Sequence, residues 1–132
     1  MKLKYAIILS IIPIFLFARM EKELYKEFEH CNNQVEYVNT AIMMSCADQV
    51  SEHAKEKITK FYKIIYFKIK KQSKEEALQF ELSQKNWIKY RDNYCVLTGN
   101  YIGSPNYSLC PMHLNIKRAQ ELIDFADDAF AD

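Results

Sequence analysis

The stretch that decides the fold is QKNWIKYRDNYC, which runs from Gln84 to Cys95. At 3.6 residues per turn, a helix places five of its residues along one side: Gln84, Trp87, Ile88, Arg91 and Cys95. Because this side carries the only tryptophan of the chain, an isoleucine and a cysteine, we expect it to face a core. The arginine on the same side needs polar partners, since a guanidinium keeps its charge when it is buried.

Composition restricts the fold class. The chain has 132 residues, which is enough for one domain with a modest core. It has only 2 glycines and 3 prolines, so a sheet-rich fold with many turns is not expected. Charged residues make up 27% and hydrophobic residues 49% of the chain, as is typical of a globular protein.

The first eighteen residues have the layout of a secretory signal. Two lysines precede an apolar run from Ala6 to Phe17, and Ala18 is a small residue suited to a cleavage site. The alternative is an uncleaved anchor helix, since Leu16 is a poor residue three places before the cut. However, the apolar run is short for a membrane span, and Pro13 interrupts it. We expect cleavage after Ala18, which leaves residues 19–132 as a single periplasmic or secreted domain without a membrane span.

The charge balance argues against an anionic partner. Loss of two lysines from the 18 basic residues leaves 16 against 17 acidic ones, a net charge of −1. We therefore expect no nucleic-acid partner. The segment KFYKIIYFKIKK, Lys60 to Lys71, could bind an anionic membrane surface or nucleic acid. We favour a solvated helix instead, because its lysines are spread around the helix and its apolar residues continue a core stripe.

The four cysteines predict two disulfides, as is usual in a small exported domain. Three pairings are possible, but Cys31 and Cys46 are fifteen residues apart, and so are Cys95 and Cys110. Pairing these neighbours closes two local loops, each worth about 3 kcal/mol in the chain-entropy model. We favour this pairing, which leaves no thiol for catalysis.

Hydrophobic spacing predicts the helices. Residues 19–29 form a short helix or a docked arm, and Asn39 is an N-cap for a long amphipathic helix from about Thr40 to Lys70. Ser73 and Glu76 have the spacing of a capping box, which opens the helix that contains the stretch quoted above.

Both glycines and Pro105 predict a turn over Gly99–Tyr107, followed by a last helix. We expect this helix to start at Ser108, because Pro111 is tolerated only in a first turn. Its inner stripe would contain Cys110, Leu114, Arg118, Leu122 and Phe125. The predicted fold class is all-α, a small bundle of three to four helices cross-linked by two disulfides.

Motifs for enzyme chemistry are not found in the sequence. It contains no CxxC, no GxSxG and no glycine-rich phosphate loop, and it has only 3 histidines. The acidic residues are scattered along helix surfaces. We expect a protein that is not an enzyme and that binds neither a metal ion nor a cofactor.

The order of several residues resembles the LprI-type lysozyme inhibitor family. The matching residues are Gln84, Trp87, Arg91, Asp92 and Cys95, then Cys110, Leu114, Arg118 and Leu122, with Asn39, Thr40 and Cys46 upstream. The resemblance runs from about Cys31 to Phe125. It implies an exported all-helical domain with two disulfides, and by the activity that names the family it implies inhibition of lysozyme.

Two functional hypotheses follow. The first is a secreted or periplasmic bacterial protein that binds and blocks a lysozyme-type muramidase, with Tyr101, Ile102 and Tyr107 in the predicted turn as contact residues. The alternative is a structural or protein-interaction module of the bacterial envelope that does not inhibit lysozyme.

The inner arginines, Arg91 and Arg118, also allow two interpretations. They form either an anion-recognition site or internal ties between helices, and we favour the ties. Carboxylates would then have to lie beside them. The acids within reach by helix position are Glu121, Asp124, Asp48 and Glu52.

Overall fold

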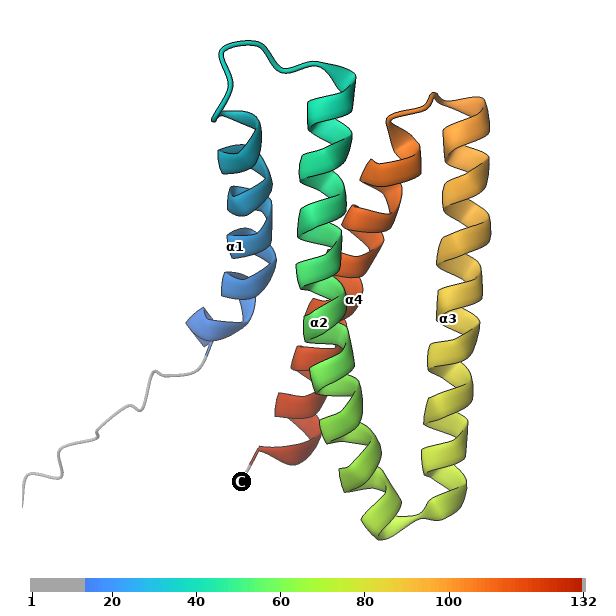
Figure 1. Ribbon diagram of the computed structural model, residues 1–132. Helices are drawn as coiled ribbons and strands as arrows, with labels where there is room; N and C mark the ends of the chain where they lie inside the picture. Colours follow the sequence, from blue (N-terminus) through green and yellow to red (C-terminus); the bar gives the residue numbers. More distant parts are fainter. Residues whose placement is uncertain (1–13, 132) are drawn as a thin grey trace, which may run out of the picture.

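The computed structural model describes residues 14–131, with side chains from Met20 onward, and all four of its elements are helices. They are α1 (Ile14–Asn32), α2 (Thr40–Gln72), α3 (Lys74–Tyr101) and α4 (Asn106–Phe130). Helix α4 contacts each of the other three, and Figure 1 shows it beginning between α2 and α3 and crossing behind α2, with α1 beside α2. The predicted all-α bundle is confirmed.

The predicted signal segment, residues 1–18, lies outside the described residues except for the backbone of residues 14–18, which begins α1. Its cleavage therefore stays a prediction. Within residues 14–131, the helices are all too short or too polar to cross a membrane.

Helix α2 begins where its cap predicts. The side chain of Asn39 accepts a hydrogen bond from the backbone N–H of Ile42 at 3.0 Å, which satisfies one of the free donors of the first turn. The helix continues to Gln72, two residues beyond the predicted end at Lys70. Its buried residues lie on one stripe: Cys46, Ala47, Val50, Ser51, Ala54, Ile58 and Ile65.

A single residue, Ser73, separates α2 from α3. Its backbone N–H donates to the carbonyl of Ile69 at 2.8 Å, and its hydroxyl accepts from the N–H of Glu76 at 3.2 Å. The predicted cap at Ser73 is confirmed. Because this one extended residue both ends α2 and begins α3, the two helices fold back against each other at the lower end of Figure 1.

The turn between α3 and α4 is shorter than predicted. It contains only residues 102–105, and α4 begins at Asn106 instead of Ser108. Pro105 is the N-cap of α4, and its backbone carbonyl accepts from the N–H groups of Ser108 and Leu109. The prediction that Pro111 lies in a first turn was therefore wrong, since Pro111 is inside α4. The disulfide at Cys110 and the buried Met112 hold the helix around it.

Two clusters of buried side chains form the core. The first lies where α1, α2 and α4 meet: Leu24, Ala47, Val50, Ala54, Met112 and Ile116. The second lies nearer the carboxyl end of α2: Ile58, Ile65, Ala119, Leu122 and Ala126, with Phe80 and Trp87 of α3 packed against it. Helix α3 buries mainly small or polar residues, so polar contacts must contribute to its attachment.

Two residues predicted to face the core lie at its edge. Ile88 is 38% exposed and Phe125 is 44% exposed. The stripe that α3 buries is narrow, and Ile88 lies at its border, beside a groove between α2 and α3. The buried face of α4 centres on Asn115, Ile116 and Ala119, which turns Phe125 to the margin, where it stacks on Phe80.

The predicted disulfides are both confirmed. Cys31 pairs with Cys46, and Cys95 pairs with Cys110, with Cα–Cα distances of 5.7 and 5.4 Å. Both lie at the upper end of the bundle in Figure 1, where α1 and α3 end and where α2 and α4 begin.

Candidate functional site

Both inner arginines lie beside the same indole ring. The guanidinium carbon of Arg91 is 5.4 Å from the ring centroid of Trp87, and that of Arg118 is 5.6 Å from it. These distances fit cation–π interactions. Arg91 and Trp87 come from α3, whereas Arg118 comes from α4, so the ring lies at the contact between these helices. We call Gln84, Trp87, Arg91, Asn115 and Arg118 the Trp87 cluster.

Arg118 ties α4 to α3 through a neutral acceptor. Its Nε and Nη2 atoms donate to Oε1 of Gln84 at 3.0 and 2.9 Å, and Gln84 is buried. Its remaining nitrogen, Nη1, donates to Oε2 of Glu121 at 2.9 Å. Every nitrogen of this guanidinium therefore donates to an acceptor inside the protein.

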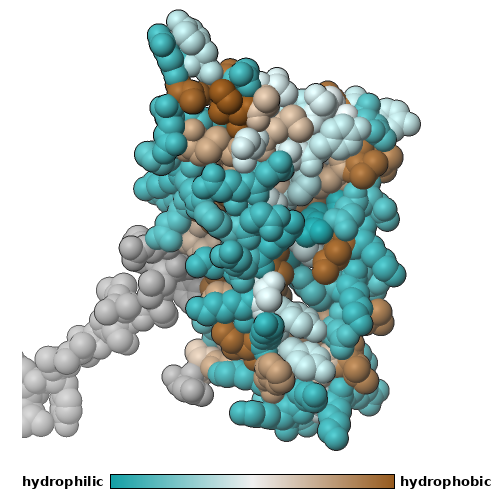
Figure 2. All heavy atoms as spheres, in the orientation of Figure 1, coloured by the Kyte–Doolittle hydropathy of each residue, from teal (hydrophilic) through white to brown (hydrophobic). Residues whose placement is uncertain are grey.

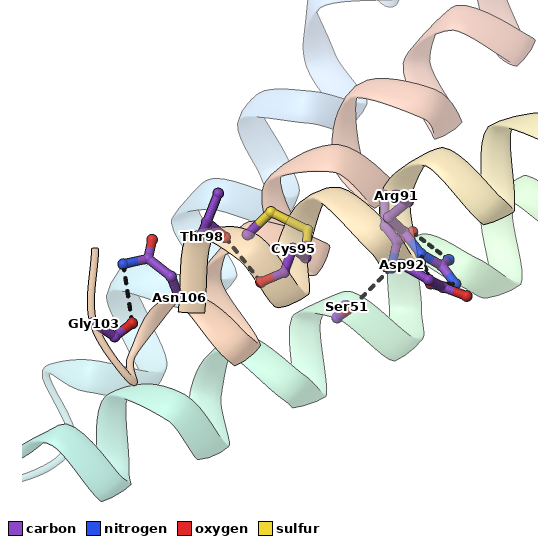
Figure 3. The surroundings of a disulfide bond; sticks show 9 residues. Ser51, Arg91, Asp92, Cys95, Thr98, Gly103 and Asn106 are labelled. Carbon is purple, nitrogen blue, oxygen red and sulfur yellow. Dashed lines mark hydrogen bonds and ion pairs between the residues drawn. A yellow bond between two sulfur atoms is a disulfide. The ribbon is translucent and has the colours of Figure 1, made fainter. Parts of the chain in front are cut away.

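Arg91 is held in the same way. Its Nε and Nη2 atoms donate to Oδ1 of Asp92 at 2.8 and 2.6 Å, and its Nη1 donates to Oδ1 of Asn115 at 2.9 Å. Asn115 is fully buried, and its amide donates in turn to the hydroxyl of Ser51 at 2.8 Å. One chain of hydrogen bonds thus joins α3, α4 and α2. Figure 3 shows Arg91, Asp92 and Ser51 close to the Cys95 disulfide.

The predicted acid partners of the arginines were mostly wrong. Of the four acids named above, Glu121 alone bonds to an arginine. Asp124 accepts from Gln120, Glu52 pairs with Lys55, and Asp48 forms no ion pair with either arginine among the described residues. The acceptors that were missed are the amides of Gln84 and Asn115, and Asp92. An amide oxygen satisfies a buried guanidinium without a second buried charge.

The turn that follows α3 is fixed from within. The Cys95–Cys110 disulfide spans it, the hydroxyl of Thr98 donates to the carbonyl of Cys95, and the amide of Asn106 donates to the carbonyl of Gly103 (Figure 3). Gly103 has φ of +141°, a value that residues with side chains rarely adopt. We call residues 95–110 the cross-linked turn.

The three predicted contact residues of this turn do not project together. Tyr101 and Ile102 are the most exposed, at 85% and 73%. Tyr107 instead lies against α3, where its ring covers Gly99 and its hydroxyl donates to the side chain of Asn100. Only Tyr101 and Ile102 therefore offer a freely accessible apolar surface at the tip.

More apolar residues are exposed at the same end of the bundle. Val35, Tyr37 and Val38 are exposed in the segment between α1 and α2, and Leu97 is exposed near the end of α3. Figure 2 shows brown and tan side chains gathered at this upper end, above a mostly hydrophilic middle. Sequence reasoning missed Val35 to Val38, although apolar residues just before the Asn39 cap were a signal for an exposed apolar loop.

The family model of the lysozyme inhibitor LprI matches residues 31–122. The chain belongs to the LprI family. The match covers well over half of the chain. No curated protein and no solved structure matches the chain.

In this LprI chain, the matched region contains both disulfides, the whole Trp87 cluster and the cross-linked turn. It excludes almost all of α1 and the last turns of α4. The matched region thus covers the two cross-links and the polar contacts that attach α3 to α4, but not the complete bundle.

A groove between α2 and α3 is a concave feature of this LprI chain. It has a volume of about 500 Å³, and Trp87, Tyr62, Ile58 and Ile88 line its apolar part. Its charges are already paired: Lys85 with Glu81, and Lys55 with Glu52. The hydrogen bond from Lys85 to Glu81 raises the pKa of Lys85, and burial raises the pKa of Tyr62.

The described side chains form no cluster of the kind that holds a metal ion. Between residues 20 and 131, histidine, cysteine and carboxylate side chains nowhere gather in the numbers that a metal site needs. The Trp87 cluster has the geometry of a tie between helices, because both guanidinium groups direct all their nitrogens to protein acceptors. The exposed apolar side chains of Tyr101 and Ile102 lie at the cross-linked turn.

Proposed function

We propose that this protein is exported and inhibits a lysozyme-type muramidase by binding it, without catalysing a reaction. The observation that carries the proposal is the match of residues 31–122 to a family of lysozyme inhibitors. The two disulfides support export, because such bonds form and persist in oxidising compartments. Residues 19–132 are proposed as the exported domain, located in the periplasm or outside the cell.

The contact surface that we propose is the tip of the cross-linked turn, with Tyr101 and Ile102 at its centre. A muramidase cleaves between two carboxyl groups in a cleft that must admit a sugar chain. A partner can block such a cleft by filling it. A large exposed tyrosine beside an isoleucine is suited to this, since aromatic side chains give much contact area for little loss of rotamer entropy.

Rigidity of the turn supports this choice. Ordering a flexible loop on binding costs about 0.5–1.5 kcal/mol for each immobilised side chain, in addition to the backbone cost. The Cys95–Cys110 disulfide and the hydrogen bonds of Thr98 and Gly103 fix the backbone of the turn before any partner arrives. Less of the interaction energy is then lost when a complex forms.

Lysis of a bacterial cell-wall suspension tests the proposal. The oxidised protein is added to lysozymes of several types, and the fall in turbidity is followed. We expect slower lysis by at least one lysozyme at micromolar protein. The double variant Tyr101→Ser/Ile102→Ser should lose this effect. Its matched control, Leu78→Ser/Leu82→Ser, changes two exposed residues near the other end of α3 and should keep it.

Two results would contradict the proposal. Unchanged lysis with every lysozyme at a micromolar excess would remove inhibition as the function. The alternative, an envelope module that binds a different protein, would then be tested by pull-down from envelope extract. Equal inhibition by wild type and by Tyr101→Ser/Ile102→Ser would retain the function but exclude the tip as its contact surface.

A further inference from the structure

The second half of α2 has an outer face on which lysines and apolar residues lie together. Six exposed residues recur there at steps of three and four: Lys60, Lys63, Ile64, Phe67, Lys70 and Lys71. We call them the basic face of α2. The opposite side of the same turns, with Ile65, Phe61 and Ile69, packs into the core. Phe67 is 58% exposed, although phenylalanine side chains are usually buried.

This arrangement corrects the expectation that the lysines of this segment are spread around the helix. Lys68 alone points inward, where its ammonium donates to the backbone carbonyl of Phe130 at 3.1 Å. The other four lie within the basic face. Apolar residues therefore occur on both sides of this part of α2, and those on the outer side do not continue the core stripe.

The basic face is also free of acids. From Lys57 to Lys74 the chain has seven lysines and no aspartate or glutamate. Its four lysines form no ion pair with a carboxylate of the described residues. The nearest acids in sequence are Glu56, one turn before Lys60 on α2, and Glu75 and Glu76, which begin α3. Glu56 lines a groove together with Lys60 and Lys63, so it borders the basic face at its amino-terminal end. The net charge of the whole chain is close to zero, but the surface around the basic face of α2 is positive.

We propose that the basic face of α2 docks on the surface of an anionic phospholipid membrane. The lysines would contact lipid phosphates, while Phe67 and Ile64 would enter the boundary between headgroups and acyl chains. This is how amphipathic surface helices bind, with basic residues supplying electrostatic attraction and apolar ones supplying buried area. Each lysine near such a surface contributes roughly a threefold to tenfold gain in affinity, the equivalent of about 1 kcal/mol.

Two features favour a membrane over a nucleic acid as the partner. The face contains no arginine, whereas phosphate recognition on nucleic acids relies heavily on the arginine fork. The six residues also lie along one side of a single helix over roughly 18 Å, so they can reach an extended surface together. Figure 1 places this part of α2 at the opposite end of the bundle from the cross-linked turn, so docking would leave the tip accessible.

Sedimentation with lipid vesicles tests the inference. The exported, oxidised protein is mixed at low salt with vesicles of phosphatidylglycerol and phosphatidylcholine, or of phosphatidylcholine alone. We expect binding to the anionic vesicles only, with binding decreasing as salt is added. The variant Lys60→Gln/Lys63→Gln/Lys70→Gln/Lys71→Gln should bind at least about tenfold more weakly. Phe67→Ser should bind several-fold more weakly, because apolar area is lost.

The matched control has the same net charge. It is Lys22→Gln/Lys26→Gln/Lys89→Gln/Lys117→Gln, four exposed lysines on α1, α3 and α4. All variants share one N-terminal segment, so differences between them report on α2. Thermal unfolding checks that each variant folds.

Three results would overturn the inference. The first is that the protein does not sediment with anionic vesicles. The second is that the control variant loses as much vesicle binding as the variant of the basic face. The third is that the protein binds an anionic oligonucleotide but not the vesicles. None of them bears on lysozyme inhibition.

Discussion

Nη1 of Arg91 donates a 2.9 Å hydrogen bond to Oδ1 of Asn115, a side chain that is fully buried in α4. The side-chain amide of Asn115 donates in turn to the hydroxyl of Ser51 on α2. This relationship explains why an arginine stands on the core side of the stretch Gln84–Cys95. Its long side chain lies beside Trp87, and its charge is spread over acceptors on α3 and α4.

Replacing Arg91 should affect stability rather than binding. Arg91→Ala leaves the buried oxygen of Asn115 without its donor, so we expect the free energy of unfolding to fall by roughly 2–4 kcal/mol. Urea unfolding measures this loss. Arg91→Lys serves as the control, because it keeps the charge but not the fork, and it should lose a similar amount. An unchanged unfolding midpoint with abolished lysozyme binding would show instead that Arg91 contacts a ligand.

Removing the Cys95–Cys110 disulfide should weaken inhibition beyond its effect on folding. The substitution of both cysteines by alanine should cost about 2–5 kcal/mol of stability and should free the turn that carries Tyr101. Removal of the Cys31–Cys46 disulfide is the matched control, because this disulfide closes a loop of equal length. We expect a larger loss of inhibition per folded molecule in the first variant. Equal losses in both would exclude a special role for the turn.

Gly99 should not tolerate a side chain. A methyl group at Gly99 would overlap the ring of Tyr107, which would have to leave its place and give up its hydrogen bond to Asn100. We expect Gly99→Ala to lower stability by about 1–3 kcal/mol in thermal unfolding. In a Tyr107→Ala background the same substitution should cost much less. An equal cost in both backgrounds would show that the ring is not the obstacle.

Mild acid should destabilise the contact between α1 and α4. The hydroxyl of Tyr25, on α1, lies within hydrogen-bond distance of Nδ1 of His113, on α4, at 3.0 Å. Burial against Tyr25 and the charge of Lys117 both lower the pKa of His113 below its ordinary value near 6.5. The unfolded chain therefore binds this proton more readily, so stability falls as the pH drops from about 6.5 through the folded pKa.

Thermal unfolding between about pH 7.5 and pH 5.5 measures this effect, in a range where most carboxylates stay charged. The melting temperature of the wild type should decrease toward the acid end. His113→Gln cannot be protonated and should show a flatter dependence. Parallel curves for the two proteins would contradict the assignment to His113.

The parts of the fold that depend on local sequence were predictable. Asn39 and Ser73 marked helix starts because a cap bonds within its own turn, and equal cysteine spacing indicated the local disulfide pairs. The partners of Arg91 and Arg118 were not predictable in the same way. They depend on the rotation of α3 against α4, which brings two neutral amides, Gln84 and Asn115, nearer than the expected acids.

The exposed surfaces were the least predictable part. The turn was expected over Gly99–Tyr107, but α3 continues to Tyr101 and α4 begins at Asn106, which shortens the turn. Tyr107 therefore lies on α3, and Tyr101 and Ile102 are left at the tip. A helical pattern gives the faces of a helix but not which face its neighbours cover. For that reason Ile88 and Phe125 were assigned to the core.

The most direct test of the central proposal is a calorimetric titration of the oxidised protein into each lysozyme of the inhibition panel. We predict saturable one-to-one binding to at least one of them. Tyr101→Ser/Ile102→Ser should bind at least about tenfold more weakly with an unchanged melting temperature. No binding to any lysozyme would contradict the proposed function, and an unchanged affinity in the variant would contradict the proposed contact surface.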